Sequence, residues 1–141
     1  MNLRAYDTSR AAENFGTEIP IVPEDEFFRG GAPVVLVGVP TDPRFRNTLR
    51  IYAPGDVGSP MLVEIDGAGV NIDHVVQLRA PEGALQPAYA QFSNFPTGVG
   101  PVRVRITPVI PAPIEGGSSY WAFISVTNNE TQHITTVTPQ P

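Results

Sequence analysis

The fold is indicated most clearly by the stretch Tyr120-Trp121-Ala122-Phe123-Ile124-Ser125-Val126-Thr127, which continues through Asn128-Asn129-Glu130 into Thr131-Gln132-His133-Ile134-Thr135-Thr136-Val137-Thr138. Both flanking runs are rich in β-branched and aromatic residues, which are enriched in strands. Asparagine tolerates the positive φ that tight hairpin turns require. The stretch therefore predicts a β-hairpin with strands over 120–127 and 131–138, and it places His133 opposite Ile124 or Val126.

Upstream, the sequence is a succession of similar short runs separated by Gly, Pro, Asn and Asp. No helix-length insert lies between the runs, which is typical of an antiparallel all-β fold. Several runs alternate with period two; over 102–107, for example, Val and Ile alternate with Arg and Thr, as in a half-solvated strand. The other predicted strands are Thr17–Val22, Pro33–Val39, Arg46–Tyr52, Met61–Asp66, Ile72–Arg79, Ala88–Phe92 and Val102–Thr107.

The chain of 141 residues has the size of one domain, and its 41% hydrophobic fraction is enough for one core. We therefore expect a single antiparallel β-sandwich of roughly seven to nine strands over residues 17–141. An irregular N-terminal arm over 1–16 precedes it, because Leu3 to Asn14 lacks the apolar stripe of a helix. The predicted core consists of Val35, Val37, Leu49, Ile51, Leu62, Val76, Leu78, Val102, Val104, Ile106, Ile124 and Val126.

The charge balance and the missing residue types disfavour several classes of function. The net charge is −5, and all nine basic residues are arginine. Nucleic-acid and anionic-membrane binding depend on clustered basic residues, so we expect neither. Without lysine and cysteine the chain has no Schiff-base chemistry, disulfide, thiolate nucleophile or Cys-type zinc site. No apolar window is long enough for a membrane span, and no signal peptide is visible, so an exported form would have lost its signal or been cut from a longer chain.

Two motifs carry a resemblance to a known family. They are Phe45-Arg46-Asn47-Thr48-Leu49-Arg50-Ile51-Tyr52-Ala53-Pro54 and Trp121-Ala122-Phe123-Ile124-Ser125-Val126-Thr127-Asn128-Asn129-Glu130-Thr131. These motifs resemble those of the immunoglobulin-like β-sandwich modules of secreted and surface proteins of bacteria. The matching stretch runs from about Thr17 to the C-terminus. The resemblance implies an accessory or structural module with an extracellular or cell-surface location, and it brings no catalytic motif.

No combination of residues predicts a catalytic, cofactor or metal site. His74 and His133 show no metal-ligand spacing, so we interpret them as sheet-face residues. The run Glu24-Asp25-Glu26 and the turn aspartates lack calcium-loop spacing and are interpreted as solvated loop residues. No serine lies in a Gly-x-Ser-x-Gly motif. The turn aspartates meant here are Asp42, Asp56, Asp66 and Asp73. We therefore expect a protein that is not an enzyme and holds no cofactor.

The strand predicted over 120–127 is apolar on both faces. Tyr120 and the even-numbered residues after it share one face, while Trp121 and Phe123 occupy the other. Such a strand is buried on both sides or presents an exposed patch. Trp121, Phe123 and the adjacent Tyr120 are therefore the candidate interface residues. Either the chain itself covers the outer pair, through Pro108–Ile114 or the N-terminal arm, or another copy of the protein does.

These features favour a non-enzymatic structural or protein-interaction module of an exported bacterial protein, with other protein domains or copies of itself as partners. One alternative is a self-assembling subunit of an extracellular filament or surface layer, in which Asn2–Asn14 or Thr17–Val22 adds to a neighbour's sheet edge. Another is a glycan-binding module that uses Tyr52, Tyr89 or Trp121, because aromatic rings stack on sugar faces.

Overall fold

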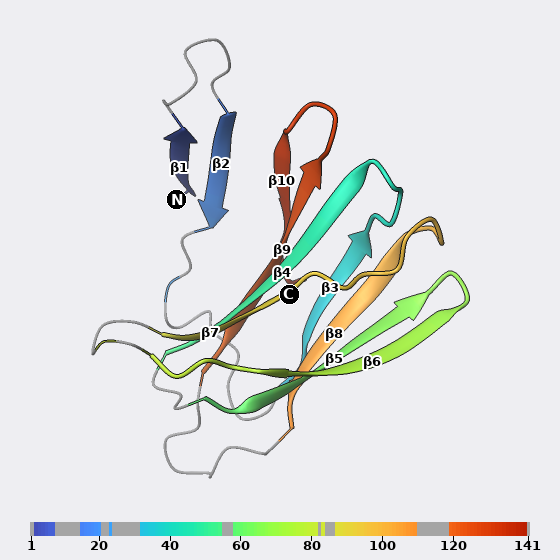
Figure 1. Ribbon diagram of the computed structural model, residues 1–141. Coiled ribbons are helices and arrows are strands. Elements are labelled where there is room, and N and C mark those ends of the chain that lie inside the picture. The colour runs from blue at the N-terminus through green and yellow to red at the C-terminus, as the bar shows by residue number, and fades with distance from the viewer. Residues whose placement is uncertain are drawn as a thin grey trace.

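Ten strands make up the regular structure of the computed structural model, which describes residues 2–7, 15–20, 23, 32–54, 58–81, 83, 87–109 and 119–140 (Figure 1). No helix occurs in these ranges, and so none that could cross a membrane. The strands are β1 (Asn2–Asp7), β2 (Phe15–Pro20), β3 (Val34–Val39), β4 (Phe45–Ala53), β5 (Pro60–Gly67), β6 (Val70–Gln77), β7 (Ala88–Phe92), β8 (Val102–Pro108), β9 (Trp121–Asn128) and β10 (Ile134–Val137).

Eight of the strands form two four-stranded antiparallel sheets. The sheet that we call the β9 sheet has the order β10-β9-β4-β7, and the β8 sheet has the order β3-β8-β5-β6. Among these eight strands, only β5–β6 and β9–β10 are consecutive strands that pair with each other; every other connection from β3 onward passes from one sheet to the other. This arrangement confirms the all-β prediction and is consistent with a β-sandwich.

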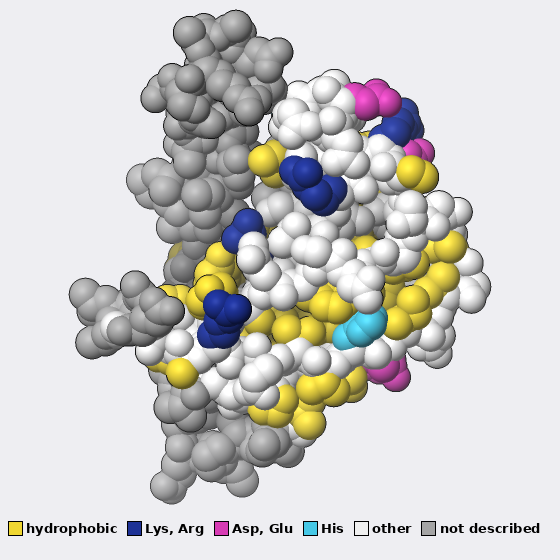
Figure 2. All heavy atoms as spheres, in the orientation of Figure 1, with side chains coloured by type: hydrophobic (Ala, Val, Ile, Leu, Met, Phe, Trp, Pro, Cys, Tyr) yellow, Lys and Arg dark blue, Asp and Glu magenta, His cyan; other side chains and the backbone are white. Residues whose placement is uncertain are grey.

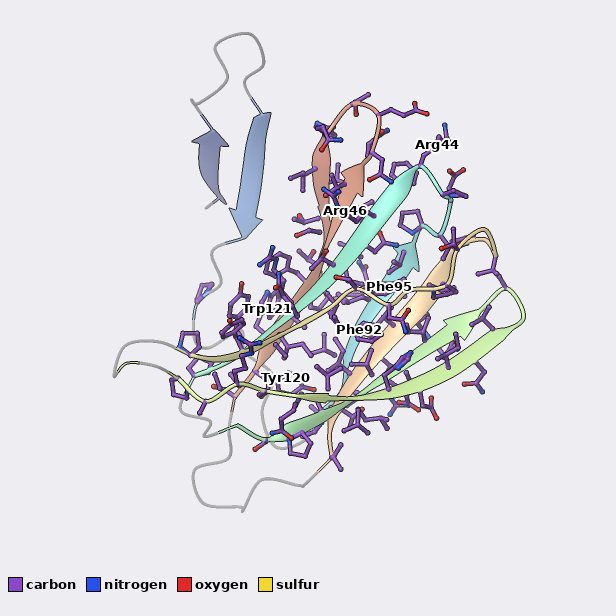
Figure 3. The ribbon with its side chains drawn as sticks, viewed as in Figure 1. Arg44, Arg46, Phe92, Phe95, Tyr120 and Trp121 are labelled. Atoms are coloured by element: carbon purple, nitrogen blue, oxygen red, sulfur yellow. The ribbon has the colours of Figure 1, made fainter. Side chains whose placement is uncertain are left out.

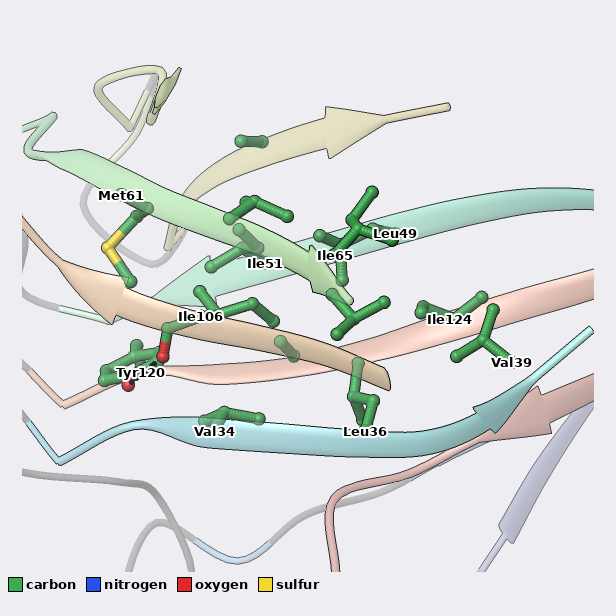
Figure 4. Packing of buried hydrophobic residues seen from close by; sticks show 14 of the residues in the cluster. Val34, Leu36, Val39, Leu49, Ile51, Met61, Ile65, Ile106, Tyr120 and Ile124 are labelled. Carbon is green, nitrogen blue, oxygen red and sulfur yellow. Dashed lines mark hydrogen bonds between the residues drawn. The ribbon is translucent and has the colours of Figure 1, made fainter. Parts of the chain in front are cut away.

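The hydrophobic core lies between the two sheets (Figure 4). It is built by alternation: in β4, β8 and β9 every second residue points inward, as the sequence predicts for Leu49, Val104 and Ile124. The other core predictions that are confirmed as buried are Ile51, Leu78, Val102, Ile106 and Val126, and Val76 is partly buried against the core.

The core predictions for β3 and β5 are wrong by one residue. Val35, Val37 and Leu62 were expected inside, but the buried residues are Val34, Leu36 and Val39 in β3 and Met61, Val63 and Ile65 in β5. Both runs are apolar at consecutive positions, so alternation alone does not choose a face, and a shift of one residue exchanges the faces. Pairing with β8 decides which residues face inward.

A β-bulge in β3 explains how Leu36 and Val39 both reach the core. The register with β8 shifts between these residues, and Gly38 adopts a φ of 73°. Glycine takes this left-handed conformation without the steric penalty that a Cβ atom brings. The extra residue returns Val39 to the inner face and leaves Val37 43% exposed.

The C-terminal hairpin forms, but its turn is longer than expected. Ile124 and Val126 pair with Val137 and Thr135, so the placement of His133 opposite one of them is wrong. The Oδ1 atom of Asn128 accepts hydrogen bonds from the backbone N–H groups of Glu130 (2.9 Å) and Thr131 (3.1 Å). The positive φ falls on Gln132 (59°). Asparagine thus acts here through its side-chain oxygen, which stabilises a wider turn.

The N-terminal region also departs from the expected irregular arm. Asn2–Asp7 is a strand that pairs in antiparallel fashion with Phe15–Pro20, where a strand was expected from Thr17 to Val22. This β1–β2 hairpin is a separate two-stranded sheet, and β2 lies beside β10, the edge strand of the β9 sheet (Figure 1). The side-chain pattern of 3–14 does not indicate a strand, because the regular structure of β1 comes from backbone pairing with a second segment.

Candidate functional site

An aromatic row crosses the outer face of the β9 sheet. Tyr52 in β4 is the register partner of Tyr89 in β7 on one side and of Trp121 in β9 on the other. Directly paired residues point to the same face, with Cβ atoms about 4.5–5.5 Å apart. Tyr89, Tyr52 and Trp121, which we call the aromatic row, therefore stand side by side on three adjacent strands.

The accessibility of the aromatic residues changes along the sheet. Tyr89 is 38% exposed, and Tyr52 and Trp121 are half-buried. Phe123 lies on the same face, stacks on Tyr52 with ring centroids 6.2 Å apart, and is only 7% exposed. Trp121 and Phe123 thus point away from the core, as predicted, but Phe123 is almost fully covered, whereas Tyr89 in the row is exposed. Their role in an interface stays a prediction.

Tyr120, the third candidate interface residue, lies inside the sandwich and is 2% exposed. Its hydroxyl group is within hydrogen-bond distance of the carbonyl oxygens of Ala32 and of Ile106, the latter at 3.1 Å. Burial raises the pKa of this phenol above its ordinary value of 10.0. In this chain Tyr120 therefore links the start of β9 to β8 and to the segment before β3.

A polar cavity of about 310 Å³ lies at one end of the sandwich, and we call it the end cavity. It is formed where the β3–β4 connection, the start of β4, the segment after β7 and the β9–β10 turn meet. Its lining consists of two phenylalanines, one arginine, two asparagines, two threonines, one serine and one proline. The lining residues are Thr41, Phe45, Arg46, Asn47, Ser93, Phe95, Pro96, Thr97 and Asn129.

Hydrogen bonds fix the loops around the end cavity. The Thr41 side chain is 3% exposed; its Oγ1 atom donates to the carbonyl oxygen of Gly100 (2.6 Å) and accepts from the N–H of Val99 (3.1 Å). The N–H of Asn129 donates to the carbonyl oxygen of Arg44 (2.8 Å). Phe95 packs edge-on against Phe92 with centroids 5.4 Å apart (Figure 3). The cavity walls are therefore held in place by the protein's own contacts.

Asn47 is the unusual residue in this lining. It is 6% exposed, and its Nδ2 atom donates to the carbonyl oxygen of Pro40 at 2.6 Å. Its Oδ1 atom is buried, and no group among the described residues donates to it. Buried polar atoms in proteins nearly always have a partner, so an orphaned acceptor beside a cavity calls for an explanation.

Sequence reasoning missed this residue, although a signal was present. Asn47 is in phase with Leu49 and Ile51, so a polar side chain stands at a core-facing position of β4. A polar residue at such a position has to find a hydrogen-bond partner inside the protein or in a ligand.

Two of the four turn aspartates, Asp42 and Asp66, form ion pairs. Asp42 pairs with Arg44 at 3.0 Å, and the hydrogen bonds from Arg44 lower the pKa of its carboxyl group. Asp66 pairs with its register partner Arg103 at 2.7 Å. Asp73 is exposed, whereas Glu24-Asp25-Glu26 and Asp56 lie outside the described residues.

The two histidines lie in different parts of the fold. His74 packs against Phe92 with ring centroids 4.7 Å apart, and His133 is exposed in the last turn. Across the described ranges, no three His, Asp or Glu side chains are grouped so that they could hold a metal ion.

No protein-family model matches the chain, and no curated protein or solved structure is significantly similar to it.

Proposed function

We propose that the domain is a non-enzymatic structural or protein-interaction module of an exported bacterial protein, and that it contacts its partner through the outer face of the β9 sheet. The observation that carries this proposal is the aromatic row. Large aromatic side chains on a rigid sheet lose little conformational freedom on binding and are enriched among the residues that dominate interface energies.

The charges around the row indicate what kind of partner would fit. The outward positions of β4 carry Arg50 next to the row and Arg46 further along the strand, and no acidic residue occupies an outward position of the β9 sheet. In the orientation of Figure 1, arginine side chains are seen beside hydrophobic ones (Figure 2). This face is therefore locally basic in a chain with a net charge of −5, which favours an acidic rim on the partner.

Site-specific photo-crosslinking tests the proposal in cells that naturally produce the protein. A photoreactive phenylalanine analogue replaces Tyr89 in the row, and a matched variant carries it at Val75, which is 67% exposed on the outer face of the β8 sheet. We expect a discrete crosslinked protein from position 89 only, and its loss in the Trp121→Ser background. Equal labelling from both positions, or none, contradicts the proposal.

The immunoglobulin-like relationship is also part of the proposal. In support, β4 pairs with β7 in one sheet and β5 with β8 in the other, as strands B and E and strands C and F do in immunoglobulin sandwiches. The last long strand differs, because β9 pairs with β4 and not with β8.

Self-assembly by strand addition is a second candidate. β10 is an edge strand, and the β1–β2 hairpin lies beside it. A hairpin that leaves this place and pairs with β10 of a neighbouring copy would link subunits. Removal of residues 1–20 followed by light scattering tests the idea: assemblies that persist without the hairpin argue against it.

A further inference from the structure

We infer that the partner meets this domain with an extended acidic segment, which pairs as a strand with the open edge of β7 at Gln91 and places a carboxylate against Arg79. The inference rests on the proposed function, because it names the part of the partner that lies beside the aromatic row. It is carried by a cavity at this edge, by the direction of the Gln91 backbone groups and by the charge of the adjacent guanidinium groups.

The cavity lies where the chain leaves β6 and passes beside β7, which is an edge strand of the β9 sheet (Figure 1). It has a volume of about 300 Å³, and we call it the β7 pocket; its lining residues are Gln77, Arg79, Tyr89, Ala90 and Gln91. The N–H of Arg79 donates to the carbonyl oxygen of Tyr89 (2.8 Å), and the N–H of Tyr89 donates to the carbonyl oxygen of Arg79 (3.2 Å). Backbone pairing thus holds the two segments together beside the pocket.

These two hydrogen bonds determine where the backbone groups of Gln91 point. In an antiparallel sheet, the N–H and C=O groups of successive residues point alternately to the two sides of their strand. Tyr89 directs both groups to Arg79 and so away from β4, and Gln91, two residues further along β7, points the same way. Among the described residues, no backbone group pairs with the N–H and C=O groups of Gln91. The edge of β7 therefore offers one donor and one acceptor to an added strand.

The side chains at this edge favour an acidic segment. Since directly paired residues point to the same face, the exposed Arg79 stands next to Tyr89 and extends the aromatic row. Arg50 is the register partner of Gln91, and with the Gln91 amide oriented to satisfy both groups its two Nη atoms donate to the Gln91 side-chain oxygen at 3.1 and 3.2 Å. None of the ion pairs that the described residues form includes Arg79 or Arg50. Two guanidinium groups without a carboxylate partner attract an anionic group.

The register of an added strand brings the backbone groups and the charge together. A residue opposite Gln91 would exchange both backbone hydrogen bonds with it and point to the outer face of the sheet. That residue would continue the line of the chain at Arg79, two positions and so about 7 Å away, which long side chains can span. A glutamate there satisfies Gln91 and Arg79 at once. A small free anion would reach Arg79 but would bring no donor for the carbonyl oxygen of Gln91.

An NMR titration of the ¹⁵N-labelled full chain tests the inference. The probes are the peptide acetyl-Thr-Val-Glu-Val-Thr-amide, the same peptide with glutamine in place of glutamate, acetate and inorganic phosphate. We expect the acidic peptide to give saturable shifts of the Gln91 backbone N–H and the Arg79 side-chain Nε–H signals, and the glutamine peptide to bind about tenfold more weakly. No saturable shift with the acidic peptide overturns the inference. Equal saturation of these signals by acetate or phosphate also overturns it, because the pocket would then bind anions without strand pairing.

Methylation of the peptide backbone separates strand pairing from charge attraction. N-methylation of the glutamate removes the donor to the carbonyl oxygen of Gln91, whereas N-methylation of the following valine places the methyl group on the other edge of the segment. We expect the first change to abolish the shifts and the second to leave them in place. Equal effects of the two methyl groups would contradict pairing at Gln91.

Arg79→Gln, with Arg105→Gln as its matched control, assigns the partner of the carboxylate. Both arginines are exposed, and Arg105 lies on the outer face of the β8 sheet. We expect Arg79→Gln to remove the preference for the glutamate peptide over the glutamine peptide, and Arg105→Gln to keep it. A preference that survives in Arg79→Gln overturns the inference.

The crosslinking experiment at Tyr89 is independent of these titrations. A crosslinked protein from position 89 together with no peptide binding contradicts the strand-addition inference alone. Peptide binding at Gln91 without any crosslinked protein contradicts the proposed function alone.

Discussion

The hydroxyl group of Tyr120 lies 3.1 Å from the carbonyl oxygen of Ile106, so a side chain from the start of β9 reaches the backbone of β8 in the opposite sheet. The ring is 2% exposed and belongs to the core cluster. The same hydroxyl group approaches the carbonyl oxygen of Ala32, which precedes β3. One side chain thus connects three parts of the chain that are distant in sequence.

Replacement of Tyr120 by phenylalanine should destabilise the fold although it removes one atom only. The carbonyl oxygens of Ala32 and Ile106 would lose a buried donor, so we expect the free energy of unfolding to fall by about 1–2 kcal/mol. Urea unfolding followed by circular dichroism measures the change. Tyr89→Phe, at a position that is 38% exposed, is the control, and its effect should stay within about 0.5 kcal/mol. Equal effects would show that the Tyr120 hydroxyl group adds nothing.

Tyr120 should also make the stability depend on alkaline pH. Burial raises its pKa in the folded state above the ordinary 10.0, so the unfolded chain releases this proton first as the pH rises. The folded state then binds more protons than the unfolded state, so the contribution of Tyr120 to stability is constant below pH 10 and falls above it. Because the chain contains no lysine, no lysine ammonium group titrates in this range.

The measurement compares urea midpoints of the wild type and of Tyr120→Phe from neutral to strongly alkaline pH. We expect the wild-type midpoint to fall more steeply above pH 10, so the advantage of the wild type over the variant shrinks there. Parallel curves for the two proteins would contradict the raised pKa.

Phe123 and Tyr89 lie on the same face but should respond differently to truncation. Phe123 is 7% exposed and stacks on Tyr52, so Phe123→Ala should lower the free energy of unfolding by about 3 kcal/mol. Tyr89 is 38% exposed, and Tyr89→Ala should cost less than about 1 kcal/mol. Thermal unfolding of both variants checks the contrast. A small effect at Phe123 would mean that the chain in solution leaves this ring uncovered, as an interface role for Phe123 requires.

The sequence predicts the strands well where one face is apolar and the other polar. In β8, arginines at 103 and 105 mark the outer face, so the inward positions of Val102, Val104 and Ile106 are unambiguous. In β5, valine and leucine occupy neighbouring positions, and the pairing of β5 with β6 and with β8 decides that Val63 points inward while Leu62 does not. Such pairing is a tertiary property that no local pattern contains.

The candidate sites also depend on tertiary structure that no local sequence pattern contains. Tyr52, Tyr89 and Trp121 were each visible as possible ligand contacts, but their alignment in one row depends on the registers of β4 with β7 and with β9. The end cavity forms where three loops meet. Its only sign in the sequence is Asn47, a polar residue at a core-facing position of β4. Side-chain chemistry is thus readable from the sequence, whereas the position of each group relative to the others is not.

The bulge in β3 gives a prediction about register. Gly38 has a φ of 73°, and a Cβ atom added there would meet no atom within 4 Å, so the backbone conformation alone opposes a side chain. Gly38→Ala should therefore lower the free energy of unfolding by about 1–2 kcal/mol, the penalty for an L-residue in the left-handed region.

Gly83→Ala is the matched control, because its Cβ atom would also meet nothing within 4 Å and its φ lies outside the positive range. That change should be neutral or slightly stabilising, since alanine restricts the unfolded chain more than glycine does. If the two variants have the same urea midpoint, Gly38 is not in the left-handed conformation. Val39 would then have no bulge to bring it to the inner face, and Val39→Ala should cost far less than the roughly 2 kcal/mol expected for truncating a core valine.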